Sequence, residues 1–171
     1  MPGSDDTARE RLRRRYRPAD VRLLFIGESP PASGRFFYQG DSGLYRAIRD
    51  AFLAADPSIT RDGFLSAFQN SGCYLIDTCL HPVDHLDPRP RRAACLAAEP
   101  SLALQIRDLR PAAIVTLLRS IRDNVRRAAA AAEWNGPIVE VPYPGRWASH
   151  RKLFLENLTP HLELLFARRE L

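Results

Sequence analysis

Residues 21–30 read VRLLFIGESP, and this stretch decides the fold. Its apolar run ends at Gly27, a pattern typical of a buried strand that leads into a loop. Similar short apolar runs occur at residues 73–77, 113–118 and 137–141. Because helical patterns separate the four runs, the sequence predicts an α/β fold, a three-layer sandwich in which helices cover both faces of a four-stranded parallel sheet.

The helical spacing of apolar residues predicts the elements between these strands. A basic helix over residues 7–16 precedes the first strand, and Pro18 ends it. Further helices are expected at residues 44–52, at 60–69 with Thr60 as the N-cap and Leu65 and Phe68 facing inward, at 91–109 with an interruption near Pro100, at 119–132, and at 153–165.

The chain has 171 residues, a net charge of +5 and 45% hydrophobic residues, which suits one folded domain. We divide it into a basic amino-terminal helix or arm, residues 1–20, and a single domain, residues 21–171. No apolar run approaches the ~18 residues of a membrane span, and no apolar stretch follows the first charged residues as in a secretory signal. The sequence therefore predicts a cytoplasmic protein without a membrane partner.

Three cysteines, Cys73, Cys79 and Cys95, are expected to stay reduced. Their odd number and the lack of a signal sequence suit a cytosolic protein. Cys79, His81 and His85 offer one conceivable zinc site. The proline and aspartate residues around them instead favour an ordinary loop, so no metal is expected.

Parallel strands place their carboxyl ends at one edge of the sheet, where ligands bind in folds of this class. The loops there are expected at residues 28–42, 78–90 and 142–147, and they hold many of the polar and aromatic residues. Neither a phosphate-binding GxxxxGKS/T loop nor a GxGxxG dinucleotide motif is present. Ser42, in GDSGL, offers a hydrolase nucleophile, but helix N-capping is the simpler interpretation.

Five segments, in order and at or near predicted strands, resemble the uracil-DNA glycosylase superfamily. They are LFIGESPP at residues 24–31, FYQGDSGL at 37–44, YLIDT at 74–78, LRPAAIVTL at 109–117 and VPYPGR at 141–146. The resemblance covers about residues 21–166. The Gly-Glu-x-Pro form of the first segment is similar to the iron–sulfur branch, but the three cysteines do not match that branch's four-cysteine cluster. The chain is thus identified as a divergent member without a cofactor.

The resemblance implies a DNA glycosylase that hydrolyses the N-glycosidic bond of a damaged or deaminated base in base excision repair. DNA is the expected partner, with the target base flipped out of the stack. A lyase step needs an amine nucleophile, and Lys152 is the single lysine, so a monofunctional hydrolase is expected. The alternative is a non-catalytic member that binds a nucleobase or a DNA lesion, because Ser29, Asp77 and Tyr143 depart from the family's pattern.

Three residues are the catalytic candidates that the resemblance implies. Glu28 would stabilise the developing sugar cation or position water; alternatively, it bonds to backbone amides at the strand end. Tyr143 stands in place of a histidine that stabilises the departing base, and its hydroxyl is a weaker, neutral donor. His150 lies close enough in the sequence to serve instead, or it is an inert residue on a helix face.

The resemblance also implies a set of base-binding residues: Gly27, Ser29, Pro30, Phe37, Tyr38 and Asp77. Tyr38 is the favoured stacking residue because of its place two residues before a glycine, with Phe36 and Phe37 as rivals. Asp77 matches the base-reading position. An ionised aspartate only accepts hydrogen bonds, which suits a base that offers N–H groups better than it suits uracil. Alternatively, Asp77 caps or braces the following loop.

A basic segment near the carboxyl end is the predicted DNA-binding loop, by its position in the resemblance: Arg146, Trp147, Ser149, Arg151 and Lys152. Either of the first two would wedge into the base stack, and the last three would hold phosphate. The alternative is a rim of solvated charge with Trp147 packed on the core. The arginine-rich run at residues 9–17 is left open between a phosphate-binding arm and a solvated helix face.

Overall fold

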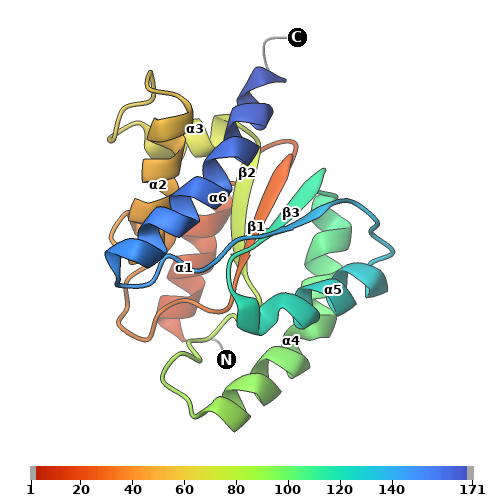
Figure 1. Cartoon of the computed structure of the whole chain (residues 1–171). Coiled ribbons are helices and arrows are strands. Elements are labelled where there is room, and N and C mark those ends of the chain that lie inside the picture. The colour runs from red at the N-terminus through yellow and green to blue at the C-terminus, as the bar shows by residue number, and fades with distance from the viewer. Residues whose placement is uncertain (1–2, 169–171) are drawn as a thin grey trace.

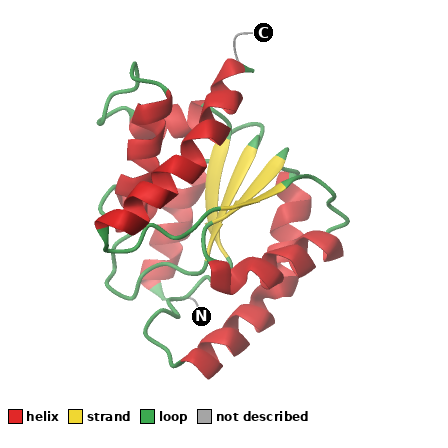
Figure 2. Ribbon diagram, viewed as in Figure 1, coloured by secondary structure: helices red, strands yellow, loops and turns green. Residues whose placement is uncertain are grey.

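A sheet of four parallel strands forms the centre of the protein, whose computed structural model describes residues 3–168. The strand order is β2-β1-β3-β4, and Figure 2 shows the strands side by side with helices around them. The predicted α/β fold with a four-stranded parallel sheet is confirmed. The strands are β1 (Leu23–Gly27), β2 (Cys73–Asp77), β3 (Ala113–Thr116) and β4 (Ile138–Glu140).

Helices cover both faces of this sheet. Helices α2 and α6 pack together on one side and α4 and α5 on the other, which gives the three predicted layers (Figure 1). No helix within residues 3–168 is long and apolar enough to cross a membrane. The helices are α1 (Ser4–Arg15), α2 (Gly43–Ala55), α3 (Phe64–Asn70), α4 (Pro88–Leu109), α5 (Arg122–Ala131) and α6 (Ala148–Ala167), with 3-10 turns η1 (Phe37–Gln39) and η2 (Arg119–Ile121).

Two helix predictions are wrong in detail. Helix α4 runs through Pro100 without a break. Pro100 lies on the exposed side of the helix, whereas buried residues on both sides of it hold the helix against the core. Helix α3 begins at Phe64 because the Thr60 hydroxyl accepts a hydrogen bond from the Gly63 amide (3.0 Å) and forms a turn before the helix. As a result Phe64 and Phe68 face the core, and Leu65 is only partly buried.

Aromatic rings fill the core between the sheet and helices α2 and α3. Phe68 is fully buried, and its ring lies 5.2–5.7 Å from four other phenylalanine rings, centroid to centroid. Such tilted and edge-on pairs add to the free energy gained by burying the rings. We call this set the aromatic cluster: Phe25, Phe37, Phe52, Phe64 and Phe68.

The loops at the carboxyl edge of the sheet diverge. The loops after β1 and β4 lead to α2 and α6, and those after β2 and β3 lead to α4 and α5 on the opposite face. Neighbouring strands whose loops turn to opposite faces leave a crevice between them, which is where open α/β sheets bind ligands. The fold therefore favours a site beyond the ends of β1 and β2, which lies at the sheet edge where the sequence analysis expects one.

The aromatic cluster gives a direct test of the core. Replacing the fully buried Phe68 in Phe68→Ala should lower the free energy of unfolding by about 3–5 kcal/mol, because the deletion removes apolar burial and leaves a cavity. Urea denaturation measures this loss. Leu104→Ala, at a position 64% exposed on α4, is the control and should change the free energy little. Equal losses in the two variants would contradict the assigned core.

Candidate functional site

A cavity of about 350 Å³ opens at the carboxyl ends of β1 and β2. Its walls come from the loop after β1, the start of α2, the loop after β2, and the segments that follow β3 and β4. The lining residues are Gly27, Glu28, Ser29, Pro30, Pro31, Phe36, Phe37, Ser42, Gly43, Leu44, Leu75, Asp77, Asp84, Arg91, Leu118 and Tyr143.

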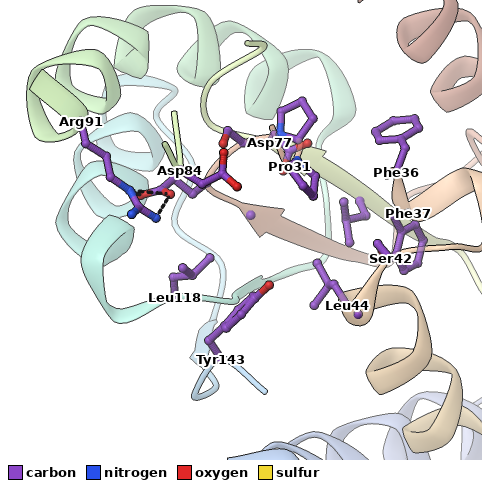
Figure 3. Close-up of a pocket in the computed structure, with 16 residues that line it drawn as sticks. Pro31, Phe36, Phe37, Ser42, Leu44, Asp77, Asp84, Arg91, Leu118 and Tyr143 are labelled. Carbon is purple, nitrogen blue, oxygen red and sulfur yellow. Dashed lines mark hydrogen bonds and ion pairs between the residues drawn. The ribbon is translucent and has the colours of Figure 1, made fainter. Parts of the chain in front are cut away.

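The cavity has an aromatic side and a charged side (Figure 3). Phe36 and Phe37 lie on one side, Arg91 lies on the other, and Tyr143 lies opposite Asp77. A flat apolar wall facing convergent polar groups is typical of a site for a planar, polar small molecule.

Asp77 is buried at the end of β2, directly opposite Gly27 in the register with β1. A Cβ at residue 27 would lie 2.7 Å from Asp77 Oδ1, so only glycine leaves room for this carboxylate. The second oxygen, Oδ2, accepts a hydrogen bond from the Arg13 guanidinium at 2.9 Å. Burial raises the pKa of Asp77 above its ordinary value, and the charge of Arg13 opposes this rise. The carboxylate is thus fixed from two sides.

Helix α1 supplies Arg13 and packs into the domain. Arg13 is 3% exposed, pairs with Glu10 as well as Asp77, and places its guanidinium 5.3 Å from the centre of the Phe36 ring. One residue past the helix, Tyr16 stacks on Tyr38 at 5.5 Å. The arginine-rich run is helical as far as Arg15, with Arg13 buried and Arg11, Arg14 and Arg15 exposed. Phosphate binding by the exposed arginines stays a prediction.

Glu28 is also buried, and a cation holds it. Arg91 on α4 donates from Nε to both carboxylate oxygens at 2.9 and 3.0 Å, and its terminal nitrogen contacts Oε1. Such a two-point contact fixes the plane of the carboxylate. The alternative in which backbone amides hold the Glu28 side chain is therefore replaced by a contact to Arg91, which no motif in the sequence had indicated.

Tyr38 does not line the cavity, so its predicted role as the stacking residue is wrong. The Tyr38 hydroxyl donates to the Leu75 carbonyl (2.9 Å) and accepts from the Leu75 amide (2.8 Å), which anchors the side chain to β2. The side chain is 2% exposed, and burial raises its pKa well above the ordinary value. Phe37, one of the rivals, lines the cavity together with Phe36.

Tyr143 lines the cavity and His150 does not. Although Tyr143 is 46% exposed, partial loss of hydration and the nearby carboxylates of Asp84, Asp77 and Glu28 raise its pKa. Its hydroxyl therefore keeps its proton at neutral pH and is able to donate it in a hydrogen bond. His150 is exposed on α6 and lies over Gly145, so the structure places it outside the cavity. The prediction that it shares the cavity with Tyr143 is wrong.

The remaining predicted residues shape the entrance of the cavity. The Ser29 hydroxyl accepts a hydrogen bond from the Val83 amide (3.1 Å) and ties the loop after β1 to the loop after β2. Pro30 is buried beside it. Ser42 caps helix α2 by accepting from the Tyr45 amide (3.1 Å). None of the four histidines, all within the described residues, lines the cavity with Ser42, which removes the support for a serine nucleophile.

Asp84 is a cavity residue that sequence reasoning missed. It lies in the loop after β2 and accepts a hydrogen bond from the Ala32 amide (3.0 Å). Its side chain is 42% exposed, and its Oδ1 lies 3.9 Å from Nδ1 of His85. The sequence did offer one signal for Asp84, because this residue lies in the loop at residues 78–90 that was already expected to border the site. The other two carboxylates in the cavity, Asp77 and Glu28, each contact an arginine. Within the described residues no arginine contacts Asp84.

A basic groove adjoins the cavity and shares Gly43 and Tyr143 with it. Of the predicted DNA contacts, Trp147 is 64% exposed and Ser149 is exposed in the first turn of α6, so the core-packed alternative for Trp147 is wrong. The other three line the groove. Its basic residues are Arg35, Arg46, Arg49, Arg146, Arg151 and Lys152. No sequence motif had indicated a role for Arg35, Arg46 or Arg49 in this groove.

The three cysteines are buried. The Sγ atoms of Cys79 and Cys95 lie 3.7 Å apart, and burial raises the pKa of Cys79 to about 12. His81 is exposed and contacts Asp6 instead (2.8 Å). Within the described part of the chain no three histidine, cysteine or acidic side chains are grouped to hold a metal ion, so the zinc alternative finds no ligand set.

The fold and the cavity define a class: an α/β protein with a pocket for a planar polar group beside a basic groove. The family model described as the uracil DNA glycosylase superfamily matches residues 14–163, most of the chain. The chain therefore belongs to the uracil-DNA glycosylase superfamily. The comparison with curated proteins finds no match. Arg13 lies one residue before the matched range.

The buried pair of Arg13 and Asp77 gives a test of the site's architecture. Arg13→Met leaves a buried carboxylate without its cation, and breaking half of a buried ion pair costs about 3–5 kcal/mol. Urea denaturation at neutral pH should show a loss of this size. Because the pKa of Asp77 rises further in the variant, the loss is smallest at acidic pH and grows as the pH rises through that pKa.

Two comparisons control this prediction. The double variant Arg13→Met/Asp77→Asn removes both charges and should recover most of the lost stability. Arg14→Met, at the exposed neighbouring position on α1, should change the stability little. A double variant as unstable as Arg13→Met would contradict the pairing.

Proposed function

We propose that this protein is a DNA glycosylase that hydrolyses the N-glycosidic bond of a base flipped out of DNA. The observation that carries the proposal is the direct junction of the cavity with the basic groove, on a chain of the uracil-DNA glycosylase superfamily. A base must leave the stack to reach an enclosed pocket. Arginine and lysine side chains beside the pocket then hold the phosphates that flank it.

The cavity suits a flipped base. Phe37, with Phe36 beside it, would stack on one face, an interaction worth about 1–3 kcal/mol per base. Asp77 would contact the polar edge. Tyr143 would donate a hydrogen bond to the departing base as negative charge develops on it. These roles use the neutral hydroxyl and the fixed carboxylate described above.

Hydrolysis breaks the bond between the sugar carbon and the base nitrogen. The bonding electron pair leaves with the base, and a water oxygen bonds to the sugar carbon and releases a proton. We assign that proton to Asp84, because arginines occupy the other two carboxylates. Glu28 would lower the energy of the sugar cation through its charge. Lys152 lines the groove rather than the cavity, in keeping with hydrolysis without a lyase step.

Cleavage assays test this assignment. Oligonucleotides with uracil, hypoxanthine, xanthine or an alkylated base, single- and double-stranded, are incubated with the protein and treated with alkali. Asp84→Asn should slow strand scission by about 10²–10⁴-fold, the range for a lost general base, and Glu28→Gln and Phe37→Ala should also slow it. Asp87→Asn, exposed in the same loop, is the matched control. Unchanged scission in Asp84→Asn would overturn its role.

Salt dependence tests the basic groove. Each phosphate contact contributes about 0.7–0.9 to the slope of log affinity against log salt. Arg46→Ala on α2 and Arg146→Ala in the segment before α6 should each lower the slope for undamaged DNA, measured by fluorescence anisotropy. Arg61→Ala, exposed and outside the groove, is the control. Equal slopes in all variants would show that DNA binds elsewhere.

A second candidate function is a non-catalytic member that binds a base or lesion. The two-point contact of Arg91 with Glu28 favours it, because a neutralised carboxylate stabilises a sugar cation less well. Tight binding to a lesion without scission on any substrate would support this candidate over hydrolysis.

A further inference from the structure

The carboxylate of Asp77 meets the cavity in one defined orientation. Oδ2 is engaged by Arg13 at 2.9 Å, and Oδ1 lies against Gly27, which lines the cavity. Arginine stays protonated in proteins, and its contact with Asp77 stabilises the ionised form. In this ionised form, Asp77 offers a ligand in the cavity a negatively charged acceptor and no donor.

The edge of a nucleobase can present either an acceptor or a donor to such a carboxylate. Uracil presents carbonyl oxygens on both sides of a single N–H, so a reader of this edge must both donate and accept. An amide does both, and so does a protonated carboxyl group, whereas a carboxylate only accepts. A carbonyl placed against a carboxylate leaves two acceptors facing each other. An exocyclic amino group instead donates to the carboxylate.

We propose that the cavity selects amino-bearing bases of the cytosine type over uracil, and that Arg13 is the positioning residue that sets this selection by holding Asp77 ionised. This inference rests on the proposed function to the extent that a base enters the cavity. It gives helix α1 a role in substrate choice.

The charges around Asp77 make the selection depend on pH. Arg13 and Arg9 on α1 favour the carboxylate, and Glu28 at the end of β1 opposes it. Tyr38, Tyr143 and the Cys79 thiol also face this charge, and each has a raised pKa. Burial raises the pKa of Asp77, so the carboxylate takes up a proton, and gains a donor, at a higher pH than an ordinary aspartate does. The affinity for uracil should then rise as the pH falls.

The experiment measures binding without cleavage. Fluorescence anisotropy compares single-stranded oligonucleotides that carry one 2′-fluoroarabino cytidine or uridine, whose glycosidic bonds resist hydrolysis, with the same strand carrying an abasic analogue. At mildly alkaline pH the full chain should bind the cytidine strand about tenfold or more tightly than the uridine strand, the preference given by one good base contact. Dividing each affinity by the affinity for the abasic strand removes the contribution of the DNA backbone.

Variants separate the positioning role of Arg13 from a structural one. In Arg13→Met the pH at which uridine affinity rises should move upward, and Arg13→Lys should restore it toward that of the parent. The double variant Arg13→Met/Asp77→Asn, which removes both charges of this pair, should prefer uridine at every pH. If Arg13→Met does not fold, the parent chain and the double variant still give the comparison.

The outcomes are distinct from those of the cleavage assay. A uridine preference in the parent at mildly alkaline pH overturns the inference, as does equal binding of the cytidine, uridine and abasic strands. A cytidine preference without scission of any substrate supports the inference while the hydrolytic function fails. A pH profile of uridine affinity that is the same in the parent and in Arg13→Met overturns the role of Arg13.

Discussion

The contact between Arg13 and Asp77 joins the amino-terminal helix to the end of a central strand, and the geometry of the cavity depends on it. Asp77 is buried, and a buried carboxylate is stable only when a cation or several donors compensate for its lost hydration. Gly27 makes the space for this carboxylate, and Phe36 lies under the arginine. One charge pair therefore fixes a strand end, a glycine and an aromatic wall together.

Cations balance most of the charge in the cavity. Asp77 and Glu28 each contact one arginine, from α1 and from α4. Asp84 stays closer to solvent. Fixed carboxylates and one more accessible carboxylate are suited to different tasks, because an ion-paired group holds a field or reads an edge, whereas a hydrated one exchanges protons. In the basic groove outside the cavity, Arg49 pairs with Asp50 (3.1 Å) and Lys152 lies 3.7 Å from Glu156, and both of these acids are exposed.

Much of the fold followed from the sequence, because apolar runs and helical spacing act locally. The closeness of Gly27 and Asp77 also followed, since parallel strands end at one edge. The predictions that failed concerned the direction in which individual side chains point. Phe36, Phe37 and Tyr38 are consecutive aromatics and all three are buried, and the bond of the Tyr38 hydroxyl to β2 holds that ring away from the cavity. Likewise, the many arginines near the amino terminus gave no signal that Arg13 alone would reach the site.

The most direct test of this account is the titration of the Asp77 carboxyl carbon by ¹³C nuclear magnetic resonance in the full chain. The account predicts a carboxylate signal at neutral pH, a protonation midpoint above that of an ordinary aspartate, and a further upward shift in Arg13→Met. A protonated Asp77 at neutral pH, or a midpoint that does not change when Arg13 is replaced, would contradict the claim that this arginine sets the charge of the cavity.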